Sequence, residues 1–417
     1  MRILLPREVL STAFFVLFLL GPLKLPGADN TPVVLNGIDI LRERNFDLLD
    51  GMRIGLITNQ TGLAVDGVPT IDLLFKSKIC KLVALFSPEH GIRGSVDEKV
   101  QSTVDEATGL PIHSLFGDVK RPTAGMLKNI DVLVFDIQDI GARFYTYITT
   151  MAYCMEEAAR ANIPFVVLDR PNPIGGLRVE GPMLEADKSS FIGYMPLPVR
   201  HGMTVGELAR YFNAENNIGA QLQVIEMKGW RRTHYFWDTG QVWVNPSPNM
   251  RNIFAAFLYP GVCLLEGTNL SVGRGTDRPF ELIGAPWIDP RRLVAAMRAA
   301  QMPGVRFVPV FFTPDADRHK GKMCGGISLQ LTDVEKLEPV LLGLTLISTL
   351  NKLYPNEFKM DRIGEYLGNA FAIRMLKEEK SPSEVLRRDG LFLQKFLAKR
   401  QRALIYDSKP SRREGRQ

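Results

Sequence analysis

Short apolar runs alternate with helical patterns between residues 52 and 227 of this chain. The four strongest runs are rich in Val, Ile and Leu on both faces, as buried parallel strands are. They are RIGLIT (53–58), KLVALF (81–86), DVLVFD (131–136) and PFVVLD (164–169). Between the last two, residues 145–162 place apolar side chains at helical spacing. Strands that alternate with helices are joined by right-handed crossovers, so the pattern predicts an α/β fold with a Rossmann-like, doubly wound parallel sheet.

The alternation continues through a capping box at Thr204 and Glu207 and a strand pattern at 222–226, and it loosens after the proline-rich segment 245–249. We therefore predict an N-terminal domain over residues 33–255 and a smaller α+β C-terminal domain over residues 256–406. The second domain is expected to contain helices at 290–300 and 334–353, a strand at 326–331 and short helices up to residue 402.

The two ends of the chain differ from the rest in composition. Arg2 and Arg7 precede an apolar run at 9–20, which is shorter than the roughly 20 residues that span a bilayer. Residues 1–28 are therefore predicted to be a signal peptide, and the protein is expected to be exported to the periplasm or the extracellular space. An uncleaved N-terminal anchor is the alternative. Residues 407–417 are predicted to form a basic tail.

The net charge of +6 comes from the ends of the chain, because residues 395–417 carry eight Lys and Arg against two acidic residues. Nucleic-acid binding needs basic side chains on a folded face, so nucleic acid is not an expected partner. No stable protein partner is predicted. The four cysteines are widely spaced and are predicted to be buried free thiols. The histidines form no H-E-x-x-H or H-x-x-H pattern, so no metal site is predicted.

A polar loop follows each of the four predicted strands. The loops are NQTG (59–62), SPEHG (87–91), QDIGAR (138–143) and RPNP (170–173). Because the carboxyl ends of parallel strands meet at one edge of the sheet, we expect these loops to converge on a ligand site. The chain has no G-x-G-x-x-G after the first strand, no phosphate-binding loop and no G-x-S-x-G elbow. Dinucleotide, nucleotide and lipase-type sites are therefore not predicted, and no cofactor is expected.

Glu89 is the candidate catalytic residue of these loops. It follows an apolar strand and stands between Pro88 and the pair His90 and Gly91. A carboxyl group at the edge of an apolar pocket tends to keep its proton, as a general acid must. In the alternative, structural role, Glu89 caps the next helix or pairs with Arg93. His90 is expected to orient Glu89, to contact substrate or to make a loop hydrogen bond.

Several motifs of the chain are long and contiguous, namely LFSPEHGIRG, FDIQDIGARFYTYITTM, LDRPNPIGG, PVRHGMTVGELA, WVNPSPNM and CLLEGTNLSVGRGT. They resemble motifs of the exo-β-N-acetylmuramidase (NamZ, YbbC-like) family, and the resemblance runs from about residue 34 to residue 406. It implies a Rossmann-like N-terminal domain, a smaller C-terminal domain and an active site in the cleft between them. It also implies an exported, exo-acting glycoside hydrolase that releases N-acetylmuramic acid from the non-reducing end of peptidoglycan fragments in cell-wall turnover. Glu89, in the family's E-H-G motif, is the implied catalytic residue.

Glycoside hydrolysis also needs a group that attacks or stabilises the anomeric carbon. Three candidates stay open, namely Asp136, Glu266 and the acetamido oxygen of the substrate itself, which Asn59, Gln138 or Tyr145 would orient. The lactyl carboxylate of muramic acid further requires a fixed cation, because a buried anion must be paired. The cation candidates in the matching motifs are Arg143, Arg170 and Arg274, each with a structural salt bridge as the alternative.

The predicted substrate-binding set is Asn59, Gln60, His90, Arg93, Asp136, Gln138, Arg143, Tyr145, Arg170, Asn172, Glu266, Asn269 and Arg274. Two other functions remain open at this point. One is a non-catalytic muropeptide-binding protein that uses the same pocket. The other is a metal-assisted hydrolase built on His90 and Asp136.

Overall fold

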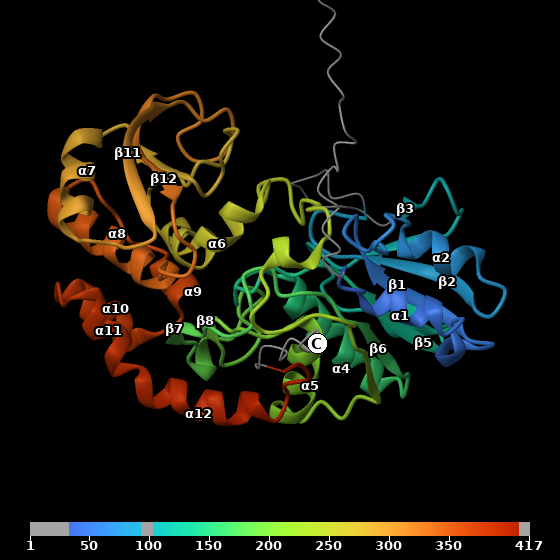
Figure 1. Cartoon of the computed structure of the whole chain (residues 1–417). Helices are drawn as coiled ribbons and strands as arrows, with labels where there is room; N and C mark the ends of the chain where they lie inside the picture. The colour runs from blue at the N-terminus through green and yellow to red at the C-terminus, as the bar shows by residue number, and fades with distance from the viewer. Residues whose placement is uncertain (1–32, 93–102, 408–417) are drawn as a thin grey trace, which may run out of the picture.

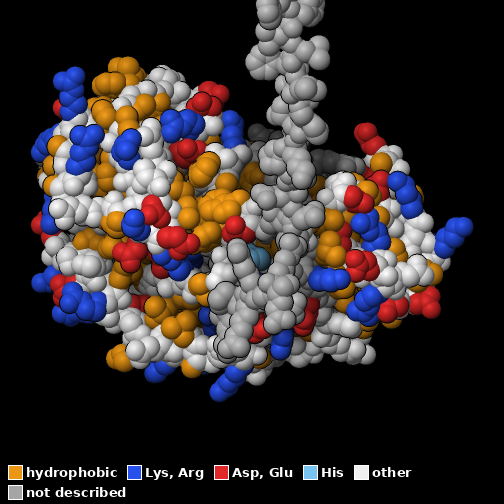
Figure 2. Space-filling view, viewed as in Figure 1, with side chains coloured by type: hydrophobic (Ala, Val, Ile, Leu, Met, Phe, Trp, Pro, Cys, Tyr) orange, Lys and Arg blue, Asp and Glu red, His pale blue; other side chains and the backbone are white. Residues whose placement is uncertain are grey.

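The computed structural model describes residues 33–92 and 103–407 (Figure 1). The predicted signal peptide, Arg93 and residues 408–417 lie outside this part of the chain. Within it, no helix has the length and apolar composition to cross a membrane. The four cysteines are buried and free, as the sequence predicts. Basic and acidic side chains are interspersed over the face seen in Figure 2, in keeping with a body that is not strongly basic.

A seven-stranded sheet in the order β3-β4-β2-β1-β5-β6-β9 forms the centre of the N-terminal domain. Its strands are β1 (Arg53–Thr58), β2 (Lys81–Ser87), β3 (Thr103–Val104), β4 (Pro111–Ser114), β5 (Val132–Asp136), β6 (Phe165–Leu168) and β9 (Leu222–Ile225). All neighbours pair in parallel except β3, which is antiparallel to β4. The strand order reverses between β1 and β5, so the predicted doubly wound α/β fold is confirmed.

The sequence does not predict β3 and β4, which extend the sheet beyond β2. The segment PIHS of β4 is short and polar at two positions, so it lacks the apolar run that marks the central strands. It is nevertheless held in register with β2, where Leu85 pairs with Ile112 and Ser87 with Ser114. Tertiary pairing therefore makes a strand that local pattern does not indicate.

Successive side chains of β5 point into two different apolar cores. Val132 and Val134 face the core that contains residues of α1 (Gly37–Glu43) and α2 (Thr70–Lys76). Leu133 and Phe135 face the other core, which is built with α4 (Tyr147–Arg160) and α5 (Val205–Glu215). Because this second core continues into the C-terminal domain, the two domains share buried apolar side chains.

Helix α5 begins as the sequence predicts. The backbone N–H of Glu207 donates to the Thr204 hydroxyl at 3.2 Å, and the backbone N–H of Thr204 donates to the Glu207 carboxylate at 3.1 Å. This reciprocal pair confirms the predicted capping box and satisfies two backbone donors at the helix start. A shorter helix, α3 (Ala124–Leu127), precedes β5.

The C-terminal domain packs helices against a three-stranded antiparallel sheet in the order β10-β12-β11. Its main elements are α6 (Ile253–Val262), β10 (Leu282–Ala285), α7 (Pro290–Ala299), β11 (Val305–Phe312), β12 (Cys324–Leu331) and α8 (Pro339–Leu353). Helix α8 begins at Pro339 and not at Val334, because proline suits the first helical turn. The predicted boundary at 255/256 falls inside α6, so a helix connects the two domains.

The last part of the chain returns to the N-terminal domain. Short helices α9 (Ile363–Leu367), α10 (Ala370–Lys377) and α11 (Pro382–Arg388) lead into α12 (Gly390–Gln401). Helix α12 runs below the hairpin of β7 (Glu180–Met183) and β8 (Pro198–Arg200) toward α5 (Figure 1). Beyond α12, the Tyr406 hydroxyl donates to the carboxylate of Asp169, next to the end of β6, at 2.6 Å.

Candidate active site

A cavity of about 220 Å³ lies where the two domains meet. Its lining comes from both, namely Glu89, His90, Phe144, Tyr145, Thr146, Tyr147 and Ser247 from the N-terminal domain and Tyr259, Arg274 and Phe280 from the C-terminal domain. We call it the Glu89 cavity. It contains the predicted catalytic residue together with His90, Tyr145 and Arg274 of the predicted binding set.

Glu89 reaches the cavity through a tight turn after β2. The backbone N–H of Gly91 donates to the Pro88 carbonyl at 3.1 Å, which closes a four-residue turn with Glu89 and His90 at its tip. His90 adopts a left-handed backbone conformation with φ of 70°, which is uncommon outside glycine and is found at functional sites. The Thr146 hydroxyl, one residue before α4, donates to Glu89 Oε2 at 2.5 Å and fixes the rotation of the carboxyl group.

Three tyrosines line the cavity together with Glu89. The ring of Tyr145 lies edge-on to Tyr147 at 5.0 Å and to Tyr259 at 5.7 Å. Burial raises the pKa of all three phenols, and the negative charge of Glu89 adds to the effect at Tyr145 and Tyr147. Their hydroxyl groups therefore stay neutral at physiological pH and can donate hydrogen bonds. The Tyr147 hydroxyl donates to the Pro246 carbonyl at 2.5 Å, whereas the buried Tyr145 hydroxyl has no well-formed hydrogen bond among the described residues, although Ser247 is close.

Arg274 supplies a cation on the C-terminal side of the cavity. Its Nε lies 2.5 Å from Glu266 Oε1, and its guanidinium lies 5.3 Å from the centre of the Phe280 ring. Burial opposes the charge of Arg274, but the neighbouring Glu266 raises its pKa above the usual value, so it stays protonated. Glu266 is carried by the 3₁₀ helix Cys263–Gly267 and is also within 3.5 Å of the Cys263 thiol. Glu266 thus holds Arg274 in place and is not itself in the cavity lining.

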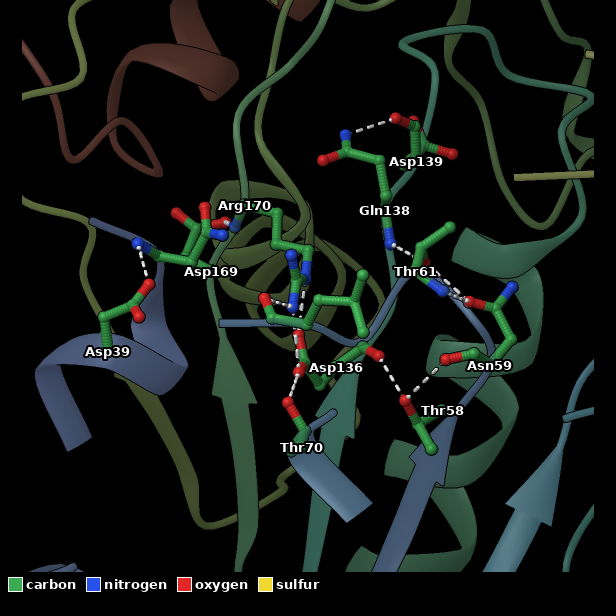
Figure 3. Close-up of polar contacts among 12 residues, drawn as sticks. Asp39, Thr58, Asn59, Thr61, Thr70, Asp136, Gln138, Asp139, Asp169 and Arg170 are labelled. Carbon is green, nitrogen blue, oxygen red and sulfur yellow. Dashed lines mark hydrogen bonds and ion pairs between the residues drawn. The ribbon is translucent and has the colours of Figure 1, made fainter. Parts of the chain in front are cut away.

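Asp136 and Arg170 form a buried ion pair away from the Glu89 cavity. Asp136 is fully buried and accepts hydrogen bonds from Arg170 Nε at 2.5 Å, Arg170 Nη2 at 3.0 Å and the Thr70 hydroxyl at 2.5 Å (Figure 3). Arg170 Nη2 also donates to the Leu63 carbonyl. Asp136 is therefore not available as a second catalytic group, and its carboxylate does not lie beside His90 as a metal-assisted site would require. The sequence predicts that Asp136 and Arg170 take part in the substrate site with Glu89, and the structure instead places them in a buried ion pair outside that cavity.

The loops after β1 and β5 are held by hydrogen bonds to each other and to the segments at 171 and 245–246. Asn59 accepts from the backbone N–H of Thr61 at 2.9 Å, and the Thr61 hydroxyl accepts from the Gln138 backbone at 2.9 Å (Figure 3). Gln138 Nε2 also donates to the Pro171 carbonyl. Gln60 donates to the carbonyls of 245 and 246. Gln138 and Arg170 line a separate cavity of about 250 Å³ at the reversal of strand order. The four loops therefore do not converge on one site, because this sheet edge is divided between two cavities.

Arg143 has a structural role that the sequence does not reveal. Its guanidinium is buried and donates to four backbone carbonyls, those of Pro182, Leu197, Tyr366 and Leu367, at 2.8–3.1 Å. It therefore joins the two domains, and four of its five N–H donors are bonded to backbone carbonyls outside the Glu89 cavity. Asn172 bonds the backbone of 174 and 203, Asn269 bonds that of 357 and 359, and neither residue lines the Glu89 cavity.

Comparisons with known proteins identify the family. A model described as exo-β-N-acetylmuramidase NamZ, N-terminal, matches residues 54–254, and its C-terminal counterpart matches residues 257–406. The chain belongs to the NamZ family. This confirms the resemblance found in the sequence motifs. The chain is 46% identical over 380 residues to the peptidoglycan β-N-acetylmuramidase NamZ of Bacillus subtilis (strain 168), covering 90% of this chain and 92% of that protein.

Two solved structures share the NamZ fold described above. Both are DUF1343 family proteins from Bacteroides fragilis NCTC 9343. One is 35% identical with a TM-score of 0.83, and the other is 32% identical with a TM-score of 0.74. Each alignment covers 90% of this chain and 99% of the other chain. The two-domain architecture is thus shared with proteins of experimentally known structure.

The sequence analysis misses several residues that line the Glu89 cavity of this NamZ-family protein. Thr146 and Tyr147 lie in the motif that contains Tyr145, and Ser247 lies in WVNPSPNM. The sequence therefore contains the motifs of these residues, but it does not show that their side chains point into the cavity. Tyr259 and Phe280 lie in a segment rich in glycines and turns that suits loops over a cleft, but neither is in the predicted site. No local pattern separates an aromatic residue that lines a cavity from one that fills a core.

Proposed function

We propose that this protein is an exo-acting glycoside hydrolase that releases N-acetylmuramic acid from the non-reducing end of peptidoglycan fragments, in cell-wall turnover and recycling. The observation that supports this most is a cavity of about 220 Å³ with a carboxyl group on one domain and an arginine on the other. Its small volume suits one terminal sugar. The NamZ relative in Bacillus subtilis is a peptidoglycan β-N-acetylmuramidase. The predicted signal peptide supports action in the periplasm or outside the cell.

In this proposal Glu89 is the general acid. Its carboxyl group donates a proton to the glycosidic oxygen as the bond to the anomeric carbon breaks. The hydrogen bond from Thr146 holds the carboxyl group in one orientation, and the neutral tyrosines line the cavity beside it. Pre-orientation of this kind lowers the barrier because no reorganisation is needed during reaction.

We assign the second role to the acetamido oxygen of the substrate. Of the two protein candidates, Asp136 is bonded to Arg170 and Thr70, and Glu266 is bonded to Arg274. Glu89 is the one carboxylate among the described residues of the cavity lining. The acetamido oxygen attacks the anomeric carbon and forms a cyclic oxazolinium ion. Water that loses a proton to Glu89 then opens the ring, so the sugar is released with its configuration retained.

The test is turnover of a chromogenic muramic acid glycoside and of a defined muramic acid–glucosamine disaccharide. We expect wild type to release N-acetylmuramic acid from both and Glu89→Gln to lose about 10²–10⁴-fold in kcat, the usual contribution of a general acid. Glu89→Gln should still bind the disaccharide and unfold at the wild-type temperature. Disaccharide binding without release by wild type would instead indicate a non-catalytic muropeptide-binding protein and would contradict the proposal.

A further inference from the structure

A larger cavity of about 730 Å³ also lies between the two domains. We call it the outer groove. Residues 120 and 188–192 of the N-terminal domain form one wall, and residues 361–373 of the C-terminal domain form the other. Its volume is within the range of about 300–1,000 Å³ that is typical of ligand sites. Nothing in the proposed mechanism uses it.

The outer groove adjoins the Glu89 cavity through Tyr366. The ring of this partly buried tyrosine lines the outer groove and lies 6.4 Å from Phe144, which lines the Glu89 cavity. The charges of Glu266 and Arg274 act on the phenol of Tyr366, so it is also close to the ion pair of the Glu89 cavity. The ring pair of Phe144 and Tyr366 therefore lies between the two spaces, and the outer groove is the neighbouring space on this side of the Glu89 cavity.

The N-terminal wall of the outer groove presents two exposed lysines. Lys120 Nζ lies 4.8 Å from the centre of the Phe191 ring, and Lys188 Nζ lies 3.0 Å from the exposed carboxylate of Asp187. An exposed ion pair of this kind contributes little to stability, so the lysine can readily exchange its partner for another anion. On the opposite wall, the carboxylates of Asp361 and Glu365 stand beside Arg362, the single cation among the described residues of that wall, whose Nη2 lies 2.5 Å from Glu365 Oε2. The two lysines are therefore the groups best placed to receive an anionic ligand.

We propose that the outer groove binds the glycan beyond the scissile bond, and that Lys120 and Lys188 recognise a carboxylate on the second muramyl residue. This inference rests on the proposed function. A terminal muramic acid occupies the Glu89 cavity, the adjoining neutral amino sugar lies against Tyr366, and the next muramyl residue carries the negative charge. That charge is its lactyl carboxylate in a peptide-free chain, or the carboxylates of the stem peptide where one is attached.

The experiment compares substrates that stop short of the lysines with substrates that reach them. The short ones are the chromogenic glycoside and the disaccharide, and the long ones are tetrasaccharides with and without stem peptides. Lys120→Met/Lys188→Met is compared with Lys128→Met/Lys352→Met, a control pair of exposed lysines outside the outer groove. We expect the first pair to lose about tenfold in kcat/KM for a tetrasaccharide, as for loss of a charge-assisted contact, and to be unchanged on the short substrates. The effect should shrink as salt rises.

The two tetrasaccharides identify the source of the carboxylate, since a loss confined to one of them assigns recognition to the lactyl group or to the stem peptide. An equal loss on short and long substrates, or no loss on either tetrasaccharide, would overturn the inference. Failure of the proposed function gives a different result, namely no release from the chromogenic glycoside by wild type. In that case the outer groove is tested by measuring the Kd of the tetrasaccharide for Glu89→Gln with and without the two lysine substitutions. An unchanged Kd would overturn the inference that the lysines bind the glycan.

Discussion

The position of Glu89 depends on residues that are far apart in the sequence. The turn after β2 brings its carboxyl group to the cavity, and the Thr146 hydroxyl, 57 residues later, fixes it with a 2.5 Å hydrogen bond. Thr146 does not supply a proton in the proposed reaction, so it is a positioning residue. The contribution of Thr146 to the rate can therefore be measured separately from that of Glu89.

Thr146→Val is expected to lower kcat by up to about tenfold, because the hydroxyl orients the carboxyl group for proton transfer and an ordinary hydrogen bond contributes about 0.5–1.5 kcal/mol. Thr146→Ser keeps the hydroxyl and should restore most of the rate. Steady-state kinetics with the chromogenic glycoside measure both variants. Equal losses in the valine and serine variants would argue against positioning by the hydroxyl.

Arg274 is the remaining candidate for the lactyl carboxylate, since Arg143 and Arg170 are committed to carbonyls and to Asp136. We expect Arg274→Gln to raise KM for the muramic acid glycoside about tenfold more than KM for the corresponding glucosamine glycoside, which has no lactyl group. The ratio of the two KM values is the measurement. An equal increase for both glycosides would remove Arg274 as the selective cation.

At the scale of elements, the contact between α6 and α8 determines how the C-terminal domain packs. The helices cross at Gly261 and Gly343, where a Cβ atom on Gly261 would lie 1.7 Å from the Pro339 carbonyl oxygen and one on Gly343 would lie 2.3 Å from the Gly261 carbonyl oxygen. Backbone cannot move aside as a flexible side chain can. The two glycines therefore allow a close approach that no other residue fits.

Gly261→Ala is accordingly expected to destabilise the protein by about 1–3 kcal/mol or more, the usual cost of overpacking. Gly390→Ala, at the first residue of α12, serves as the control because a Cβ there meets no atom within 4 Å. The control should be neutral or stabilising by about 0.4–1 kcal/mol. Urea unfolding of the two variants distinguishes close packing from a general effect of replacing glycine.

At the scale of the whole molecule, residues 400–406 bind the C-terminal part of the protein to the N-terminal domain. Arg400 donates to the Gly202 carbonyl at 2.7 Å, and Tyr406 donates to Asp169 at 2.6 Å, so residues of the C-terminal part seal buried groups of the first domain. Burial raises the pKa of Asp169 to about 7. It also raises the pKa of Asp389, next to α12, to about 6. Both carboxyl groups lie at this junction.

These raised pKa values predict how stability depends on pH. The folded protein holds the Asp169 proton up to about pH 7, whereas the unfolded chain releases it near pH 4. The free energy of unfolding should therefore fall as the pH rises from about 4 to about 7, by up to about 1.4 kcal/mol per unit for one group. Asp169→Asn should reduce this slope in urea unfolding, and Asp187→Asn, at an exposed carboxylate, should not. An unchanged slope in Asp169→Asn would contradict the prediction.

The central strands, the capping box of α5 and the doubly wound topology could be predicted because each depends on local pattern. The apolar run of β1 at 53–58 is buried over all but its first residue, and its bounds agree with the structure. Strand β4 could not be predicted, because PIHS becomes a strand only through pairing with β2. In the antiparallel sheet of the second domain only β12 is predicted, although the Val- and Phe-rich run of β11 (VRFVPVFF) is also typical of a strand.

The sequence by itself determined the family, the fold class and the identity of the candidate acid, because these are carried by contiguous motifs and by the periodicity of apolar residues. Only the tertiary structure decided which polar residues meet. It places Arg274 and Tyr145 in one cavity with Glu89. Asp136, Arg143 and Arg170 instead make buried contacts with other parts of the protein. The physical reason is that a charged side chain in the interior must be paired, and its partner can come from anywhere in the chain.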